Sequence, residues 1–343
     1  MGVQISEIVP REEIELKDLK GKTIAIDAFN TLYQFLTTIR QPDGTPLMDK
    51  KGRITSHLSG LFYRNINLIL EGIKPIYVFD GKPPELKNEE LERRKEAKEI
   101  AKEKYEQAKS SGNIYDMRKY SQQFVKLDEQ IIEESKELLN AMGIPVIQAL
   151  GEGEAEAAHL TRKGNVWASA SQDYDSLLFG AEKLIRNLTL SRKRKTPSGA
   201  YVETKIELID FEKLITQLQI NKEQLICLGI LVGTDFNPGG IKGIGQKKAL
   251  EIVQKYKYPV KIFEYIEKSD KYELTFDWQR VFQIFHKYEC CTKEEIKFHK
   301  INPEKVRRLL MEYDFSEERI NSGLDKLNAV EESKKQKGLG DFL

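Results

Sequence analysis

The first half of the chain alternates short apolar segments with longer amphipathic ones. The amphipathic segment His57–Glu71 carries apolar residues at helical spacing. The short segments are rich in β-branched residues and have the length of buried strands; they are Thr23–Ile26, Pro75–Phe79, Ile144–Ile147, Val166–Ala170 and Lys183–Ile185. This alternation is typical of a parallel sheet covered by helices. We therefore predict an α/β fold with a central, mostly parallel sheet flanked by helices.

Residues 84–136 depart from that pattern because they are mostly charged. Acid–base pairs such as Glu90 and Arg94 stand one helical turn apart, and Ser110–Asn113 divides the segment in two. A helix that is polar on all sides has little core to pack against. The segment is therefore either a solvated helical excursion from the sheet or an element that faces a substrate.

The second half of the chain is predicted to be mainly helical. Residues 225–256 have the pattern of a helix, a Gly-rich turn and a second helix, and helical patterns continue to about residue 332. The last residues, 331–343, are too polar and Gly-rich to pack as a core element. We expect one domain over residues 1–330, followed by a flexible tail.

The composition excludes several classes of protein. The longest apolar stretch, Leu225–Gly233, is far shorter than the roughly 20 residues of a membrane span, and the N-terminus lacks a secretory signal. Three cysteines without a CxxC pair and four histidines without ligand spacing give no zinc pattern. The 55 basic residues against 54 acidic ones lack the basic excess that is usual in nucleic-acid binding proteins. We expect an intracellular protein without a membrane segment.

Acidic residues follow the predicted strands at the points where the strands end. Asp27 follows the first strand, Asp80 follows the second, and Asp173 with Asp175 follows the segment Val166–Ala170. A single acid in such a place is more often a helix cap or a solvated turn residue. The carboxyl ends of parallel strands, however, share one edge of the sheet, and ligands bind at that edge. These acids are therefore predicted to converge.

Three further acids are expected to join this group. Glu152 and Glu154 directly follow the strand Ile144–Ile147, and Asp235 precedes the Gly-rich turn. Clustered carboxylates repel one another, so such a cluster persists only when cations neutralise it. Oxygen ligands without Cys or His favour Mg²⁺ or Mn²⁺ over zinc. Two such ions, roughly 4 Å apart, would suit the attack of water on a phosphodiester.

Five motifs then occur in one order along the chain. They are FDGKPPELK at 79–87, GEGEAEAA at 151–158, SQDYD at 171–175, GTDF at 233–236 and GIKGIGQKKA at 240–249. In this combination the sequence closely resembles the structure-specific 5′ nucleases, and among them the flap endonucleases of archaea and eukaryotes. The resemblance implies a PIN-like nuclease fold, with a helical gateway and cap at 84–136 and a DNA-binding helix–two-turn–helix at 225–256. It thereby favours the substrate-facing interpretation of the charged segment.

The resemblance also implies an activity and its residues. The activity would be Mg²⁺-dependent cleavage of 5′ flaps at branched DNA junctions, with 5′–3′ exonuclease activity, in DNA replication (Okazaki fragment maturation) and repair. The acids would hold two Mg²⁺ ions, with Mn²⁺ able to substitute; they are Asp27, Asp80, Glu152, Glu154, Asp173, Asp175 and Asp235. Lys87 and Arg94 would clamp the scissile phosphate and stabilise its transition-state charge.

Contacts with DNA are implied outside the acidic cluster. Tyr33 would stack on a base beside the cleavage site. Other implied DNA-binding residues are Gly2, Gly243, Gly245, Lys247 and Lys248. The Gly-rich turn corresponds to a K⁺ site of the family, from which it departs by an extra residue and by Gly240 in place of a hydroxyl side chain. Residues 37–58 correspond to the wedge that splits the duplex, and the basic run 192–195 is either a solvated hairpin tip or a DNA contact.

The C-terminus fits the pattern by which DNA-repair proteins dock on the sliding clamp, PCNA. The docking residues would be Gln336, Leu339, Phe342 and Leu343, with Leu343 where a second aromatic residue is common. We expect a monomer in a prokaryotic cytoplasm, associated with the nucleoid. Two alternatives stay open: a small-molecule metal phosphohydrolase that uses the same acids, and a catalytically silent scaffold that binds DNA junctions or the clamp.

Overall fold

A seven-stranded sheet forms the centre of the computed structural model, which describes residues 2–41, 44–190, 193–195, 201–288, 290 and 296–340. The strands follow the spatial order β1-β9-β6-β5-β2-β3-β4. Their bounds are Glu12–Ile14 (β1), Thr23–Asp27 (β2), Lys74–Phe79 (β3), Val146–Gln148 (β4), Ala168–Ala170 (β5), Lys183–Arg186 (β6) and Ile206–Asp210 (β9). The neighbours from β4 to β6 are parallel, whereas β9 and β1 are antiparallel. The prediction of a mostly parallel sheet is confirmed, and β1 and β9 are strands that it did not include.

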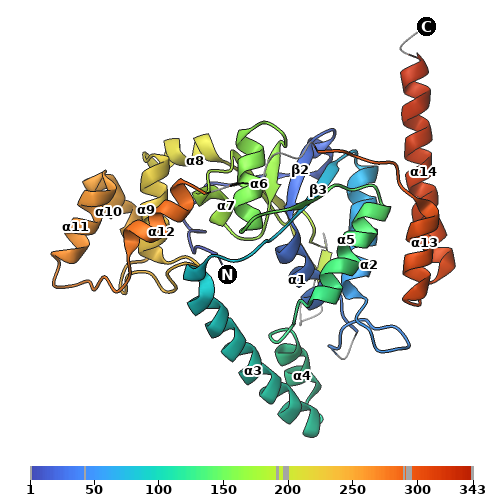
Figure 1. The fold of residues 1–343 in the computed structure, drawn as a ribbon, viewed down its shortest axis with the longest axis horizontal. Helices are drawn as coiled ribbons and strands as arrows, with labels where there is room; N and C mark the ends of the chain where they lie inside the picture. The colour runs from blue at the N-terminus through green and yellow to red at the C-terminus, as the bar shows by residue number, and fades with distance from the viewer. Residues whose placement is uncertain are drawn as a thin grey trace.

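Helices cover both faces of the sheet (Figure 1). Those near the first face are Ala28–Thr38 (α1), Ser56–Leu70 (α2), Glu129–Ala141 (α5), Pro303–Glu312 (α13) and Glu317–Gly340 (α14). The others in the main body are Gly153–Arg162 (α6), Asp175–Leu178 (α7), Phe211–Leu218 (α8), Lys222–Val232 (α9), Gln246–Tyr256 (α10), Pro259–Glu267 (α11) and Trp278–His286 (α12). Strand β3 alternates between the two sides, with Tyr77 and Phe79 in one apolar cluster and Ile76 and Val78 in another. Both faces of the sheet are therefore buried.

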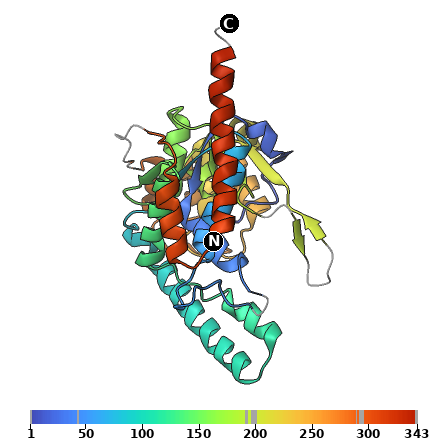
Figure 2. The same ribbon diagram turned by 90° about the vertical axis from the view of Figure 1, so that its right-hand side faces the viewer.

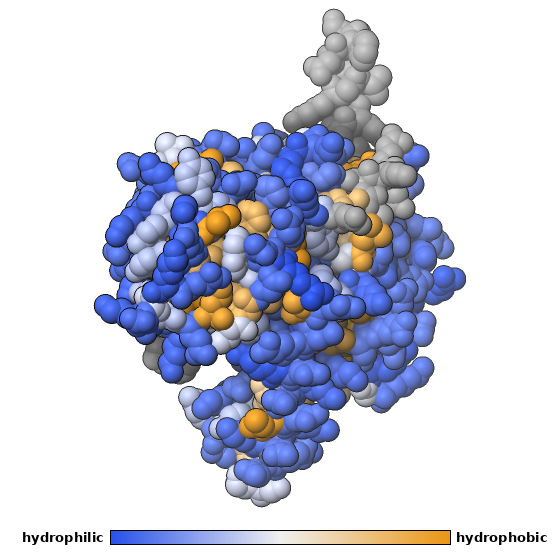
Figure 3. Space-filling model, turned by 60° about the vertical axis from the view of Figure 1, so that its left-hand side comes forward, coloured by the Kyte–Doolittle hydropathy of each residue, from blue (hydrophilic) through white to orange (hydrophobic). Residues whose placement is uncertain are grey.

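Two helices leave this body and project from it as an arch (Figures 1 and 2). The arch consists of the 3₁₀ turn Glu85–Lys87, α3 (Asn88–Ser110) and α4 (Ile114–Ser121), and the break between its helices lies where the sequence predicted it. Only three residues of α3 are buried, namely Glu90, Ala101 and Ala108. The arch is shorter than the predicted segment 84–136, because α5 packs its apolar side into the core. The arch, at the bottom of Figure 3, is hydrophilic over most of the face in view.

The predicted helix–turn–helix at 225–256 is present as α9, a Gly-rich turn and α10. The basic run forms part of a two-stranded ribbon, in which β7 (Lys193–Lys195) pairs antiparallel with β8 (Tyr201–Glu203); Arg192 lies outside the described residues. Helix α14 continues to Gly340, although we expected a flexible tail from residue 331. None of the helices in the described part of the chain combines the length and the apolar character needed to cross a membrane.

Candidate active site

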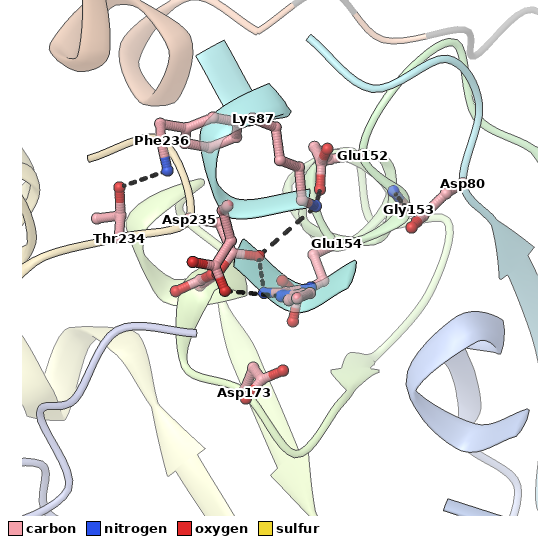
Figure 4. Close-up of polar contacts among 12 residues, drawn as sticks. Asp80, Lys87, Glu152, Gly153, Glu154, Asp173, Thr234, Asp235 and Phe236 are labelled. Carbon is pink, nitrogen blue, oxygen red and sulfur yellow. Dashed lines mark hydrogen bonds and ion pairs between the residues drawn. The ribbon is translucent and has the colours of Figure 1, made fainter. Parts of the chain in front are cut away.

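The seven acids line one cavity at the carboxyl ends of β2, β3 and β5, as the strand pattern predicted. The cavity has a volume of about 520 Å³, and its lining also includes Lys87, Arg94 and Tyr33. Glu156, the next acid in the GEGEAEAA motif, is fully buried and does not line the cavity. The structure therefore brings the predicted acids together with the two predicted catalytic cations. Figure 4 shows Lys87 with Asp80, Glu152, Glu154, Asp173 and Asp235.

Asp27 joins the end of a strand to the start of a helix. It is the last residue of β2 and the N-cap of α1, and its Oδ1 accepts a hydrogen bond from the backbone N–H of Asn30 at 3.0 Å. The side-chain amide of Asn30 donates to Asp173 Oδ2 at 3.1 Å. The carboxylate of Asp27 therefore caps helix α1 and also forms part of the cavity wall. Asn30 links Asp27 to Asp173.

Backbone groups hold two other acids in place. The N–H of Gly153 donates to Asp80 Oδ1 at 2.7 Å, and the N–H of Val3 donates to Asp175 Oδ1 at 2.7 Å. A Cβ atom at Gly153 would lie only 2.7 Å from Asp80 Oδ1, and one at Gly2 would lie 2.8 Å from Asp175 Oδ1. Both glycines are therefore required by the close approach of the backbone to a carboxylate.

Two polar residues that the sequence did not single out also support the acids. The hydroxyl of Ser171 lies 2.8 Å from Glu154 Oε1 and 3.3 Å from Asp27 Oδ2. The hydroxyl of Tyr288 accepts a hydrogen bond from the backbone N–H of Glu152. Ser171 could have been suspected because it opens the SQDYD motif, whereas Tyr288 lies beyond α12 and carries no comparable signal.

Burial and mutual repulsion raise the pKa values of several of these carboxyl groups. Burial, then the charges of Asp80 and Asp173, raise the pKa of Asp27 to about 8. The pKa of Asp175 rises to about 7 by burial and the charge of Asp235, and the pKa of Asp80 rises to about 6 by burial and the charge of Glu152. Such a site stabilises bound cations, since each one relieves this repulsion.

Lys87 and Arg94 already neutralise two of the acids, and Figure 4 shows Lys87 between Glu152 and Asp235. Lys87 Nζ lies 2.5 Å from Glu152 Oε2 and 3.7 Å from Asp235 Oδ2, and Arg94 Nη2 donates to Asp235 Oδ2 at 2.7 Å. Burial lowers the pKa of Lys87, but attraction to Glu152 outweighs this effect and the pKa is raised. The base of the arch is therefore attached to the cavity by ion pairs.

The chemistry of the donor set fits hard divalent cations. All seven acids offer carboxylate oxygens, which suit Mg²⁺ and Mn²⁺. Within the described residues, no three His, Cys, Asp or Glu side chains have donor atoms placed to hold an ion as they stand. The ion pairs made by Lys87 and Arg94 explain part of this, because two of the acids are turned towards these cations.

The predicted DNA-binding residues fall in two places. Tyr33 lines the cavity, where Lys98 Nζ lies 3.3 Å from its hydroxyl. The others do not line the cavity: Gly2 lies beside Asp173 and Asp175, Gly243 and Gly245 belong to the Gly-rich turn, and Lys247 and Lys248 to the first turn of α10. A Cβ atom at either glycine would meet no atom within 4 Å, so this part of the turn is open.

The predicted clamp-binding residues are only partly described. The backbone of Gln336 and Leu339 belongs to α14. Phe342 and Leu343 lie outside the described residues, as do Pro42 and Asp43 of the predicted wedge.

Comparison with known proteins identifies the family. Residues 1–101 match the XPG N-terminal domain and residues 143–235 match the XPG I-region. Flap endonuclease 1 of Pyrococcus furiosus is 54% identical over 341 residues, which cover 99% of this chain and 98% of that protein. The protein of the same name from Saccharolobus solfataricus is 53% identical over 328 residues, 94% of each chain.

Solved structures agree with this relationship. Flap endonuclease-1 from Methanococcus jannaschii matches with a TM-score of 0.75 at 37% identity, over 97% of this chain and 100% of that one. The catalytic core of Rad2, solved in complex with DNA substrate, shares the fold with a TM-score of 0.69 at 22% identity, over 92% of this chain and 96% of that one. The chain therefore belongs to the flap endonuclease family of structure-specific 5′ nucleases.

Proposed function

We propose that this protein is a flap endonuclease that recognises branched DNA by shape and hydrolyses a phosphodiester at the base of a 5′ flap. The observation that carries the proposal is the convergence of seven acids with Lys87 and Arg94 in one cavity at the sheet edge. A 5′–3′ exonuclease activity would use the same residues. The product, a nick that can be ligated, fits roles in DNA replication, including Okazaki fragment maturation, and in repair.

The seven acids would hold two Mg²⁺ ions, with Mn²⁺ able to substitute. Such ions, when bound, supply an activated water and neutralise the charge that develops on the phosphate. The repulsion that raises the pKa values of Asp27, Asp80 and Asp175 supports this assignment, because buried carboxylates in such numbers need cations. A K⁺ ion bound at the Gly-rich turn would be held by backbone carbonyls, since Gly240 offers no side-chain ligand.

The cations of the arch would act directly on the substrate. Lys87 and Arg94 would donate to the non-bridging oxygens of the scissile phosphate and stabilise its additional charge in the transition state. Both side chains already lie at the cavity with their charged ends among the acids. A phosphate that enters the cavity would replace Glu152 and Asp235 as the partners of Lys87 and Arg94. The two cations would thus exchange carboxylate oxygens for phosphate oxygens.

Residues around the cavity would bind the DNA without reading its sequence. Tyr33 would stack on a base beside the scissile bond. Lys247 and Lys248 would contact phosphates of the duplex, together with backbone N–H groups of Gly243 and Gly245. Gly2 would contribute to the DNA contact at the edge of the cavity, where it packs against Asp173 and Asp175.

The decisive experiment offers an end-labelled double-flap duplex to the wild type and to Asp173→Ala. We expect cleavage at the junction in Mg²⁺, none with a chelator, and a loss of about a hundred-fold or more in Asp173→Ala, because one oxygen donor of the site is removed. The matched control is Asp270→Ala, which removes an exposed acid outside the cavity.

The same experiment, with a nucleotide monoester offered as a second substrate, also decides between the rival functions. A wild type that binds the junction but never cuts it in Mg²⁺ would identify a silent scaffold. Equal turnover of a nucleotide monoester and of the flap duplex would identify a small-molecule phosphohydrolase. The family relationship speaks against both rivals, since relatives called flap endonuclease 1 match nearly the whole chain.

We further propose that the C-terminus binds the sliding clamp PCNA through Gln336, Leu339, Phe342 and Leu343. Phe342→Ala is expected to abolish stimulation of cleavage by the clamp and to leave cleavage without the clamp unchanged, because an aromatic anchor is lost from one apolar pocket. Stimulation that persists in Phe342→Ala would disprove this docking mode. The enzyme is expected to be a monomer in a prokaryotic cytoplasm, associated with the nucleoid; the relatives named above come from the prokaryotes Pyrococcus furiosus and Saccharolobus solfataricus.

A further inference from the structure

One buried carboxylate of the arch is not among the acids of the cavity. Glu90, in the first turn of α3, is only 1% exposed and does not line the cavity. Most of α3 is polar and solvated, and the other two buried residues of this helix are alanines. A buried carboxylate is stable only when other groups satisfy its charge.

Two arginines satisfy the charge of Glu90. Arg93 donates from Nε to Oε2 at 2.8 Å and from Nη2 to Oε1 at 3.0 Å. Arg94 donates from Nε to Oε1 at 2.7 Å. Hydrogen bonds between charged groups are about twice as strong as neutral ones, so Glu90 holds both side chains firmly.

The two arginines differ in their exposure and in the contacts that they make besides those to Glu90. The side chain of Arg93 is 58% exposed and does not line the cavity. Arg94 lines the cavity, and its Nη2 donates to Asp235 while its Nε remains on Glu90. The planar guanidinium of Arg94 is therefore fixed at two points, one on the arch and one on the cavity wall.

We propose that Glu90 is a positioning residue for Arg94. It holds the Nε side of the guanidinium, so that the Nη2 side can exchange Asp235 for an oxygen of the scissile phosphate without loss of orientation. The Arg94 side chain then enters the reaction with its rotamers already set, and less conformational entropy is lost when it meets the substrate. This inference rests on the proposed catalytic role of Arg94.

A purely structural role for Glu90 predicts different behaviour. Acids in the first turn of a helix interact favourably with the helix dipole, and the pair that Glu90 makes with Arg93, three residues on, stabilises the helix. Such a role would affect the order of the arch and would be independent of the presence of Arg94. The two explanations therefore differ in whether the effects of changing Glu90 and Arg94 are coupled.

A double-mutant cycle measures that coupling. Glu90→Gln, Arg94→Ala and the double variant are compared in single-turnover cleavage of the double-flap duplex with saturating enzyme, and Kd for the same duplex is measured in Ca²⁺. We expect Glu90→Gln to slow cleavage about 10- to 100-fold with Kd unchanged, since a small misplacement of a catalytic group has that cost. We expect the double variant to be as slow as Arg94→Ala alone. Multiplied effects of the two changes would overturn the proposal.

Two control variants separate the effect of the bond between Glu90 and Arg94 from the effect of a change of charge in the same part of α3. Glu89→Gln removes the neighbouring, exposed acid from the same first turn, and Arg93→Ala removes the other partner of Glu90. Both are expected to cleave within about two-fold of the wild type, because neither changes the bond between Glu90 and Arg94. Equal losses in Glu89→Gln and Glu90→Gln would favour the helix dipole and overturn the proposal.

The same data distinguish this inference from the proposed function. If Arg94→Ala cleaves as fast as the wild type, the proposed role of Arg94 fails, and the role of Glu90 fails with it. If Arg94→Ala is slow but Glu90→Gln is normal, only the inference about Glu90 fails. Thermal melting of each variant shows that the main body is folded.

Discussion

The cavity wall carries acids and the base of the arch carries cations, and different interactions hold the two regions in place. The acids of the wall stand at strand ends in the core, where backbone N–H groups of Asn30, Gly153 and Val3 fix them. The cations of the arch stand in the 3₁₀ turn and the first turns of α3, a helix with three buried residues, and they are held by ion pairs and hydrogen bonds. The groups suited to metal binding are thus part of the rigid fold, whereas the groups suited to phosphate binding are on an element with few apolar contacts.

The arch is held by polar contacts at both of its ends. At its base, Lys87 and Arg94 bind Glu152 and Asp235. At the end of α4, the hydroxyl of Ser121 donates to the carbonyl of Gly44 at 2.9 Å and accepts from Arg40 at 3.0 Å. Gly44 and Arg40 belong to residues 37–58, the segment that was predicted to form the wedge. Polar contacts exchange readily with water or with a substrate, so the arch can change partners without disrupting the core.

This difference between the cavity wall and the arch predicts that removal of Lys87 has two opposite effects, one on cleavage and one on metal binding. Lys87→Ala is expected to slow cleavage about 10²- to 10³-fold, as the loss of one donor to a developing charge does. It is also expected to increase the affinity of the DNA-free protein for Mn²⁺, because Lys87 no longer competes for Glu152. Single-turnover kinetics and calorimetric titration of Mn²⁺ measure the two effects.

Lys82→Ala is the matched control for Lys87→Ala, because Lys82 is exposed near the same end of the arch and does not line the cavity. The cleavage rate and the Mn²⁺ affinity of Lys82→Ala are expected to stay near their wild-type values. A decrease in Mn²⁺ affinity in Lys87→Ala would contradict competition between this lysine and the metal.

The sequence was sufficient to predict what depends on local pattern. The parallel strands and the acids at their ends were predicted because strand periodicity and strand ends can both be recognised over a few residues. Strands β1 and β9 were missed because they carry charged residues among the apolar ones, as in the segments Glu12–Ile14 and Ile206–Asp210. The predicted arch was too long because the apolar side of α5 is interrupted by acids.

The supporting contacts of the site were beyond prediction for a different reason. Tyr288 meets Glu152 across 136 positions of sequence, and Asn30 meets Asp173 across 143. Only the folded chain brings such residues together. Glu90 was paired with Arg94 from spacing alone, and the structure confirms that pair, but the burial of Glu90 could not be predicted from the spacing.

The stability of the two regions should differ as their packing does. Leu138→Ala in α5, a fully buried position, is expected to lower the free energy of unfolding by about 2–5 kcal/mol, because it leaves a cavity in the core. Ile100→Ala in α3, a position that is 53% exposed, is expected to change it by less than about 0.5 kcal/mol. Urea unfolding followed by circular dichroism measures both. Similar losses in the two variants would mean that the arch is part of the same cooperative core.

The smallest of these effects tests how the wall holds Asp80. Gly153→Ala keeps every carboxylate but places a methyl group 2.7 Å from Asp80 Oδ1 and 3.3 Å from the carbonyl oxygen of Val78. We expect Mn²⁺ affinity to fall about 10- to 100-fold, the usual cost of displacing a group that supports a metal ligand. Gly245→Ala adds the same methyl group in open space on the Gly-rich turn and is expected to leave Mn²⁺ affinity unchanged. Equal affinities in the two variants would show that Asp80 tolerates displacement, and that the wall is less rigid than its backbone hydrogen bonds indicate.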